Sequence, residues 1–254
     1  MAEFETVRRA GAGVDAAQID EGLRAHMNKV YGLMSIGMVI TGIIAYFVGN
    51  DLNAALNQQE TTFLSPEMLQ TMYGTSFRWV IMLAPLGVVF LFGAAVNRLS
   101  ENAARGVFML FAGLIGLSLA SIFAIYTGIS IAQTFFVTAI AFLGLSLWGY
   151  TTKRDISGWG SFLIMGVIGI IVAMIVNIFL QSEALMFAVS AIGVLVFAGL
   201  TAYDTQNIKN TYLQMAAHGQ QEWLGKAAIM GALSLYLDFL NMFQFLLMFM
   251  GSQE

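Results

Sequence analysis

The stretch that decides the fold is GVFMLFAGLIGLSLASIFAIYTGISIAQTFFVTAIAFLGLSLWGYTT, residues 106–152, which holds 47 residues without a single charge. A helix needs roughly 20 mostly apolar residues to cross a hydrocarbon core about 30 Å thick. The stretch is too long for one crossing and has the length of two, which we expect to be joined near residues 126–130. It therefore predicts two consecutive membrane-spanning helices.

Charge-free runs of similar length fill most of the remaining chain, and we expect the charges between them to mark the ends of helices. Each run holds one predicted crossing, and the runs cover residues 30–50, 79–97, 156–182, 184–203 and the segment after Lys226. With the two crossings of residues 106–152, the total is seven. The predicted fold class is all-α, a polytopic membrane bundle of seven transmembrane helices.

The composition supports this reading and excludes several classes of function. Only 10% of the residues are charged, against about 25% in soluble domains. Eleven Lys and Arg residues and a net charge of −4 argue against a nucleic-acid partner. There is no cysteine and no G-x-S-x-G nucleophile turn, so we expect neither an enzyme nor a tightly bound cofactor. The two histidines, His26 and His218, lie outside the predicted crossings, and we expect them at the polar surface.

Basic residues predict the orientation of the chain, because short cytoplasmic segments carry an excess of Lys and Arg. Only Arg78 falls on one predicted side of the membrane, which we take as the outside. We therefore expect a cytoplasmic N-terminus, a mobile cytoplasmic tail over residues 1–23, a transmembrane domain over 24–254, and a periplasmic or extracellular C-terminus. The basic residues on the cytoplasmic side are Arg8, Arg9, Arg24, Lys29, Arg98, Arg105, Lys153, Arg154, Lys209 and Lys226.

Asp238 is the most informative single residue. It lies 12 positions after Lys226, or about 18 Å along a helix that rises 1.5 Å per residue. An aspartate near the membrane centre costs roughly 2.5–3.5 kcal/mol on insertion scales, so it is a functional candidate by default. Gly231, Ser234 and Asn241 share its helical face, and this small, polar stripe is expected to face the bundle interior, with Ser234 and Asn241 as pore candidates.

Asp204 supplies a second acidic group. It ends the sixth predicted crossing and shares a helical face with Ser190, Gly193 and the pore candidate Thr201, although Phe197 interrupts the row. An ordinary role at a helix boundary is the alternative. Because Asp204 is expected near the cytoplasmic surface, the last helix must begin below that surface if the two aspartates are to meet.

Two carboxylates brought together in a low-dielectric site share a proton and titrate as a unit. When ionised, Asp204 and Asp238 would attract calcium transiently, because calcium prefers oxygen ligands. When protonated, they would hydrogen-bond between helices and hold them together. The alternative is that Asp238 is protonated and only bonds to a neighbouring helix. Arg98 could pair with either carboxylate, with Arg105 as its competitor, although topology alone also explains a boundary arginine.

Three short motifs resemble the signature of the Bax inhibitor-1 family of membrane proteins. They are Tyr203-Asp204-Thr205-Gln206, Leu235-Tyr236-Leu237-Asp238-Phe239-Leu240-Asn241 and Asn177-Ile178-Phe179. The resemblance runs from about Arg78 to Met250. It implies a seven-helix bundle with a central last helix, a pH-sensitive calcium leak, and a di-aspartyl sensor at Asp204 and Asp238. It also implies a latching arginine on the second helix, for which Arg98 is the best match.

We therefore expect a pH-sensitive cation leak, with calcium as the transported ion, in the cytoplasmic membrane of a bacterium. Its partners would be the lipid bilayer, calcium and protons. Two other functions remain open at this stage. One is a non-conducting modulator of a membrane protease or of stress survival, which would bind a membrane protein partner. The other is a proton-coupled cation exchanger, which would use the same carboxylates.

Overall fold

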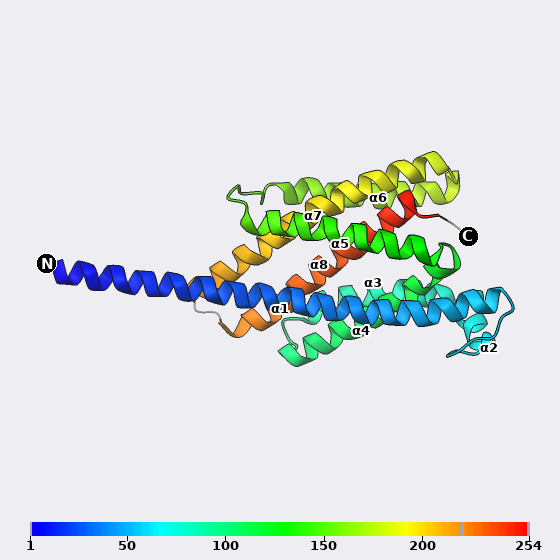
Figure 1. The fold of residues 1–254 in the computed structure, drawn as a ribbon, viewed down its shortest axis with the longest axis horizontal. Helices are drawn as coiled ribbons and strands as arrows, with labels where there is room; N and C mark the ends of the chain where they lie inside the picture. Colours follow the sequence, from blue (N-terminus) through cyan, green and yellow to red (C-terminus); the bar gives the residue numbers. More distant parts are fainter. Residues whose placement is uncertain (1, 219–220, 253–254) are drawn as a thin grey trace.

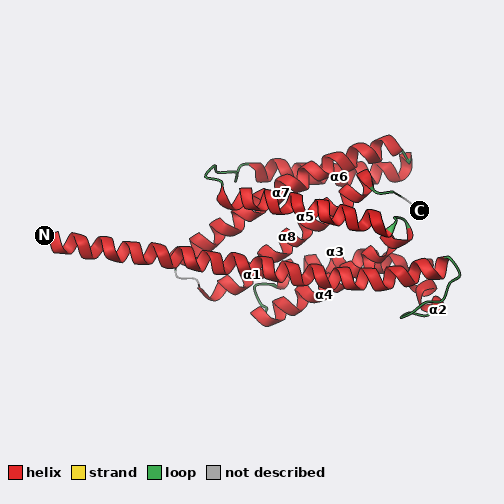
Figure 2. Cartoon of the chain, in the orientation of Figure 1, coloured by secondary structure: helices red, strands yellow, loops and turns green. Residues whose placement is uncertain are grey.

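The computed structural model describes residues 2–218 and 221–252, and within them it is helical with no strand (Figure 2). Seven helices in this part of the chain are long and apolar enough to cross a membrane, which confirms the predicted number. The elements are α1 (Ala2–Leu56), α2 (Pro66–Leu69), the π-helical turn η1 (Gln70–Gly74), α3 (Phe77–Ala95), α4 (Glu101–Leu119), the 3-10 turn η2 (Ala120–Ala124), α5 (Gly128–Thr151), α6 (Trp159–Leu180), α7 (Glu183–Ala217) and α8 (Gln221–Met250).

Capping side chains set the starts of the helices. Thr127 accepts a hydrogen bond from the backbone N–H of Ser130 at the start of α5, and Ser182 accepts one from Leu185 at the start of α7. Such caps satisfy N–H groups that have no partner inside the helix. The break at η2 and Thr127 lies where the sequence predicts the joint between the two crossings of residues 106–152.

The last helix, α8, is the centre of the bundle, as the resemblance implies. In the most apolar window of α8, 56% of the residues are buried, against 17–33% in the corresponding windows of the other six crossings. Figure 1 shows α8 passing between one group formed by α1, α3 and α4 and a second group formed by α5, α6 and α7. More of α8 than of any other crossing is therefore covered by protein, and Asp238 lies on its buried part.

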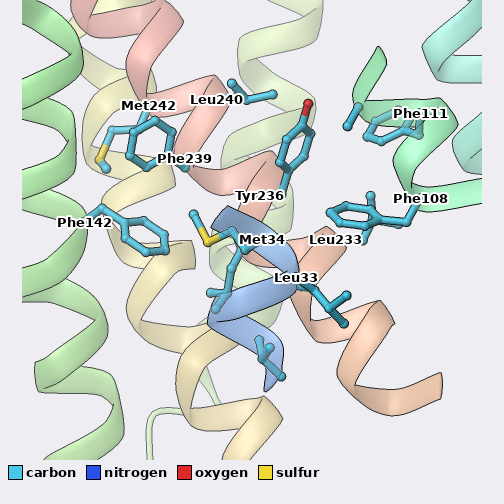
Figure 3. Close-up of a cluster of buried hydrophobic side chains, with 14 of the residues drawn as sticks. Leu33, Met34, Phe108, Phe111, Phe142, Leu233, Tyr236, Phe239, Leu240 and Met242 are labelled. Atoms are coloured by element: carbon cyan, nitrogen blue, oxygen red, sulfur yellow. The ribbon is translucent and has the colours of Figure 1, made fainter. Parts of the chain in front are cut away.

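Tyr236 fixes α8 to the first of these groups. Its side chain is fully buried, with the rings of Phe108 and Phe111 set edge-on to it at 5.6 and 5.8 Å (Figure 3). Its hydroxyl lies 2.5 Å from that of Thr41 on α1. Because the Thr41 hydroxyl already donates its only hydrogen to a backbone carbonyl of α4, Tyr236 is the donor to Thr41. Tyr236 thus anchors α8 two residues before Asp238.

Two charged residues expected at helix ends have other roles. Asp51 does not end the first helix, because α1 continues to Leu56; its buried carboxylate accepts backbone hydrogen bonds from Thr62, Phe63 and Leu64 at 2.7–2.8 Å. Lys29 lies within α1 and donates to Glu101 on α4 at 2.7 Å. Continuous helix also covers the predicted tail from Ala2 onward, while the mobility of residues 1–23 stays a prediction.

The expectation for one histidine is wrong. His26 is only 7% exposed and its ring centroid lies 5.1 Å from that of Tyr212 on α7. Because α1 and α7 both continue past the predicted membrane boundary, they pack against each other there and cover His26. His218 is exposed, as expected.

Candidate functional site

The lengths of α7 and α8 bring Asp204 and Asp238 to similar depths. Asp204 does not end the sixth crossing, because α7 continues for 13 residues beyond it to Ala217. The last helix, α8, starts at Gln221, 17 residues before Asp238. These offsets correspond to about 20 and about 26 Å along two oppositely directed helices (Figure 1). The expectation that Asp204 ends its helix is corrected, and the continuation of α7 beyond Asp204 explains how the two aspartates can meet.

Two apolar contacts bracket the acidic pair along the α7–α8 interface. Toward the connection between the helices, Ile208 packs against Gly231, where a side chain on the glycine would clash. On the other side, the rings of Phe197 and Phe245 stack with centroids 5.8 Å apart. The carboxyl groups therefore lie in a polar gap between two apolar layers.

The carboxyl groups of Asp204 and Asp238 lie within hydrogen-bonding reach of each other. Asp238 is only 4% exposed, and Asp204 is half-buried. In the part of the chain that the structure describes, Oδ2 of Asp238 is the buried side-chain oxygen without a hydrogen-bond partner. Leaving a buried acceptor unsatisfied costs about 1–3 kcal/mol. Two ionised carboxylates hold no hydrogen between them, so a proton or a cation is what would satisfy this oxygen.

The three pore candidates lie on the same two helices as the pair. Thr201 is fully buried and donates to the carbonyl of Phe197, while the half-buried Asn241 donates to the carbonyl of Leu237. Ser234 is half-buried, one helical turn before Asp238. Thr201 uses its only hydroxyl hydrogen and Asn241 uses one of its two amide hydrogens within their own helices, and the oxygen atoms of both side chains remain as acceptors. Their role in a pore stays a prediction.

A chain of hydroxyl groups, which sequence reasoning missed, positions the helix that carries Asp204. Thr205 donates to the carbonyl of Thr201, so it must accept from Ser146 at 2.9 Å, and Ser146 in turn accepts from Tyr31 at 2.6 Å. Each hydroxyl has one hydrogen, which fixes this direction. The chain links α1, α5 and α7. The position of Thr205 directly after Asp204 was the available signal.

Gln206 fixes the same region of α7 to the connection between α5 and α6. Its side-chain amide donates to the carbonyl of Arg154 at 2.8 Å and accepts from the N–H of Ile156 at 2.9 Å. Gly149 of α5 lies so close to the backbone of Ala202 that a Cβ there would collide with the Ala202 carbonyl. In the motif at 203–206, neighbouring residues therefore face different elements: Asp204 faces α8, Thr205 faces α5, and Gln206 faces the α5–α6 connection.

Neither arginine proposed as a latch contacts the pair in this structure. Arg98 is exposed and lies in the connection between α3 and α4. Arg105 pairs with Glu101 at 3.1 Å. Among the described side chains, no ion pair joins a basic residue to Asp204 or Asp238. The latch stays a prediction, without a contact to support it here.

The two aspartates alone are too few ligands for a calcium ion. Residues 2–218 and 221–252 contain no cluster of three or more His, Cys, Asp or Glu side chains that could hold a metal ion. Calcium takes six to eight oxygen ligands, of which the two aspartates can provide up to four. Side-chain oxygens of Thr201, Ser234 and Asn241, backbone carbonyls or water would have to supply the rest.

Comparison with known proteins places the chain in a family. The family model described as "Inhibitor of apoptosis-promoting Bax1" matches residues 23–254. The inner membrane protein YbhL of Escherichia coli (strain K12) is 45% identical over 233 residues, covering 92% of this chain and 94% of YbhL. An uncharacterized protein of Caulobacter vibrioides is 44% identical over 241 residues, covering 93% of this chain and 92% of its own length.

The match extends well before Arg78, where the motif-based resemblance began, and takes in the first crossing. It includes both aspartates and the hydroxyl chain that starts on α1. A seven-helix bundle with a central last helix is what the resemblance implied, and the structure has it. The chain is therefore a member of the Bax inhibitor-1 family of membrane proteins.

Proposed function

We propose that this protein is a pH-gated cation pathway, with calcium as its cargo, controlled by the proton shared between Asp204 and Asp238. The observation that carries the proposal is the buried, unpartnered Oδ2 of Asp238 beside a second carboxyl group. Similarity to the inner membrane protein YbhL supports a place in the inner membrane of a bacterium.

In the closed state one proton lies between the two carboxyl groups. The protonated carboxyl donates to the ionised one, which gives a charge-assisted hydrogen bond between α7 and α8. The stacked rings of Phe197 and Phe245 and the contact between Ile208 and Gly231 then close the interface on both sides of the pair.

Loss of the shared proton reverses this balance. Two negative charges in a low-dielectric site repel each other strongly. The described structure shows no ion pair to either carboxylate, and the nearby Lys209 directs its ammonium to the carbonyl of Tyr150 at 2.8 Å and to the ring of the same residue. Repulsion therefore favours separation of α7 from α8, and the ionised oxygens attract a divalent cation.

The sign of the pH dependence follows from this scheme. Raising the pH removes the proton that holds the interface closed, so calcium flux should rise with pH. A gate released by one proton changes its ratio of open to closed forms by at most about tenfold per pH unit, because one unit corresponds to about 1.36 kcal/mol per proton.

Purified protein in liposomes loaded with a calcium indicator tests the proposal. We expect flux that increases as the pH rises, and a loss of this response in Asp238→Asn. An unchanged response in that variant would contradict the proposal. Imposed proton gradients separate two mechanisms: calcium movement driven uphill by protons identifies an exchanger, whereas movement only down its own gradient identifies a leak.

A further inference from the structure

A groove of about 1030 Å³ lies between α1 and α5, outside the acidic pair, and we call it the α1–α5 groove. The two helices run in opposite directions along it, with residues 20–39 of α1 facing residues 135–151 of α5. Tyr31 and Ser146 bridge its walls with a hydrogen bond of 2.6 Å. Phe142, Met34 and Phe239 converge at its floor (Figure 3).

The chemistry of the α1–α5 groove changes along its length. One end is polar and carries two cations and one anion; the other end is apolar. The polar end is lined by Asp20, Arg24, Asn28, Tyr150, Thr151 and Lys209. The apolar end is lined by Met38, Val39, Phe135, Ala139, Phe142 and Phe239.

The groove is longer than one leaflet of a bilayer is thick. Its lining spans 20 residues of α1, from Asp20 to Val39, or about 28 Å along the helix axis. A leaflet with its headgroup region is about 20–22 Å thick, half of the 40–45 Å of a full bilayer. A phospholipid whose phosphate lies at Arg24 and Lys209 would therefore have room along the groove for the full length of an acyl chain.

Two basic side chains at the polar end can bind a phosphate. The Lys209 ammonium has three hydrogen-bond donors, of which one goes to the carbonyl of Tyr150. The Arg24 guanidinium pairs with Asp20 at 3.2 Å through one of its nitrogens and keeps other donors. The apolar end is open, with Val39 59% and Leu143 66% exposed. An occupant must be anionic at one end and apolar at the other.

We propose that the α1–α5 groove binds one anionic phospholipid, with its phosphate at Arg24 and Lys209 and an acyl chain along α5 as far as Phe142 and Phe239. The inference does not rest on the proposed ion pathway. The observation that carries it is the change along the groove from a basic, polar end to an apolar end, which matches the phosphate and the acyl chain of an anionic phospholipid.

Native mass spectrometry of purified, delipidated protein tests the proposal. The probes are phosphatidylglycerol and phosphatidylcholine with identical acyl chains, and inorganic phosphate. We expect one retained phosphatidylglycerol per chain and weaker retention of phosphatidylcholine. Inorganic phosphate should neither bind alone nor displace the lipid. Displacement of the lipid by phosphate would overturn the proposal, because it would mean a simple anion site.

Two pairs of variants make the test specific. Leu143→Trp fills the apolar end and should abolish preferential retention, whereas Ile140→Trp, on the same helix and 72% exposed but outside the groove, should not. Lys209→Gln should weaken phosphatidylglycerol retention about fivefold, the factor expected for one basic residue near an anionic lipid, and the exposed Lys153→Gln should not. Unchanged retention in Leu143→Trp, or a lipid-free dimer that Leu143→Trp disrupts, would overturn the proposal.

Discussion

Oδ2 of Asp238 is buried and has no hydrogen-bond partner, and the carboxyl group of Asp204 lies beside it. Tyr236 holds Asp238 there through Thr41, and Thr205 and Gln206 hold Asp204 in place from other elements. The aspartates are thus supported by neighbouring residues of the same motifs, each bonded to a different part of the bundle. This support explains how two acidic groups persist at a depth where each alone is costly.

Asp204→Asn should lock the pathway closed. The amide of asparagine can donate to Asp238 at any pH, so the bond between α7 and α8 no longer depends on a proton. We expect calcium flux in liposomes to stay at the low-pH level of the wild type across the titration. Glu183→Gln, at the exposed far end of α7, is the control and should titrate like the wild type. High flux in Asp204→Asn at every pH would contradict the scheme.

Among the helices, the apolar contacts on either side of the acidic pair hold α7 against α8. Phe197 and Phe245 stack next to Gly193, whose missing side chain leaves room for the Phe245 ring. The outer connection is fixed separately by Asp51 and by Tyr73, whose hydroxyl donates to the carbonyl of Leu117 at 2.8 Å. Burial raises the pKa of Tyr73 to about 12, so this bond persists throughout the neutral range.

Phe245→Leu should make the closed state leaky. A stacked aromatic pair is worth about 0.5–1.5 kcal/mol beyond its buried area. If that energy holds the gate shut, its loss corresponds to roughly a 2- to 13-fold rise in calcium flux at low pH. Phe249→Leu is the matched control, because its ring stacks on Phe187 at the exposed surface. Equal effects of the two substitutions would show that the layer beside the pair has no special role.

Asp51→Asn should loosen the outer connection without affecting the acidic pair. The carboxylate accepts three backbone hydrogen bonds, and bonds to a charged group are worth about 1.5–3 kcal/mol each. We expect faster cleavage between residues 57 and 76 in limited proteolysis from the outer side, with an unchanged pH profile of flux. The exposed Glu60→Gln serves as the reference. Wild-type cleavage rates in Asp51→Asn would refute this role.

For the whole molecule, the spacing of charges predicted the number of membrane crossings and singled out Asp204 and Asp238 as candidate functional residues. It did not predict how far the helices extend. Residues 205–217 continue α7 beyond the apolar run. Polar side chains there, such as Gln206 and Lys209, bond to the end of α5 and to the α5–α6 connection. No apolar pattern in the sequence predicts this continuation. Nor could charge spacing reveal that Asp51 is buried, because its partners are backbone N–H groups brought close by the fold of the outer connection.

The orientation of the bundle is open to a simple labelling test, because the chain contains no cysteine. Basic residues predict that the α5–α6 connection is cytoplasmic and that the C-terminus lies outside. In intact cells, a membrane-impermeant thiol reagent should label Ser252→Cys, while Ser157→Cys should react only after permeabilisation; both positions are exposed. The reverse pattern would invert the topology.

The proposed gate depends on one proton that Asp204 and Asp238 share and whose loss opens the interface. Infrared spectroscopy of the purified protein measures this directly, through the carbonyl band of a protonated carboxyl group. We expect a band that disappears as the pH rises and that disappears at lower pH when calcium is added. The band should be absent from Asp204→Asn and from Asp238→Asn. A band that titrates identically in the wild type and in both variants would show that the two carboxyl groups share no proton.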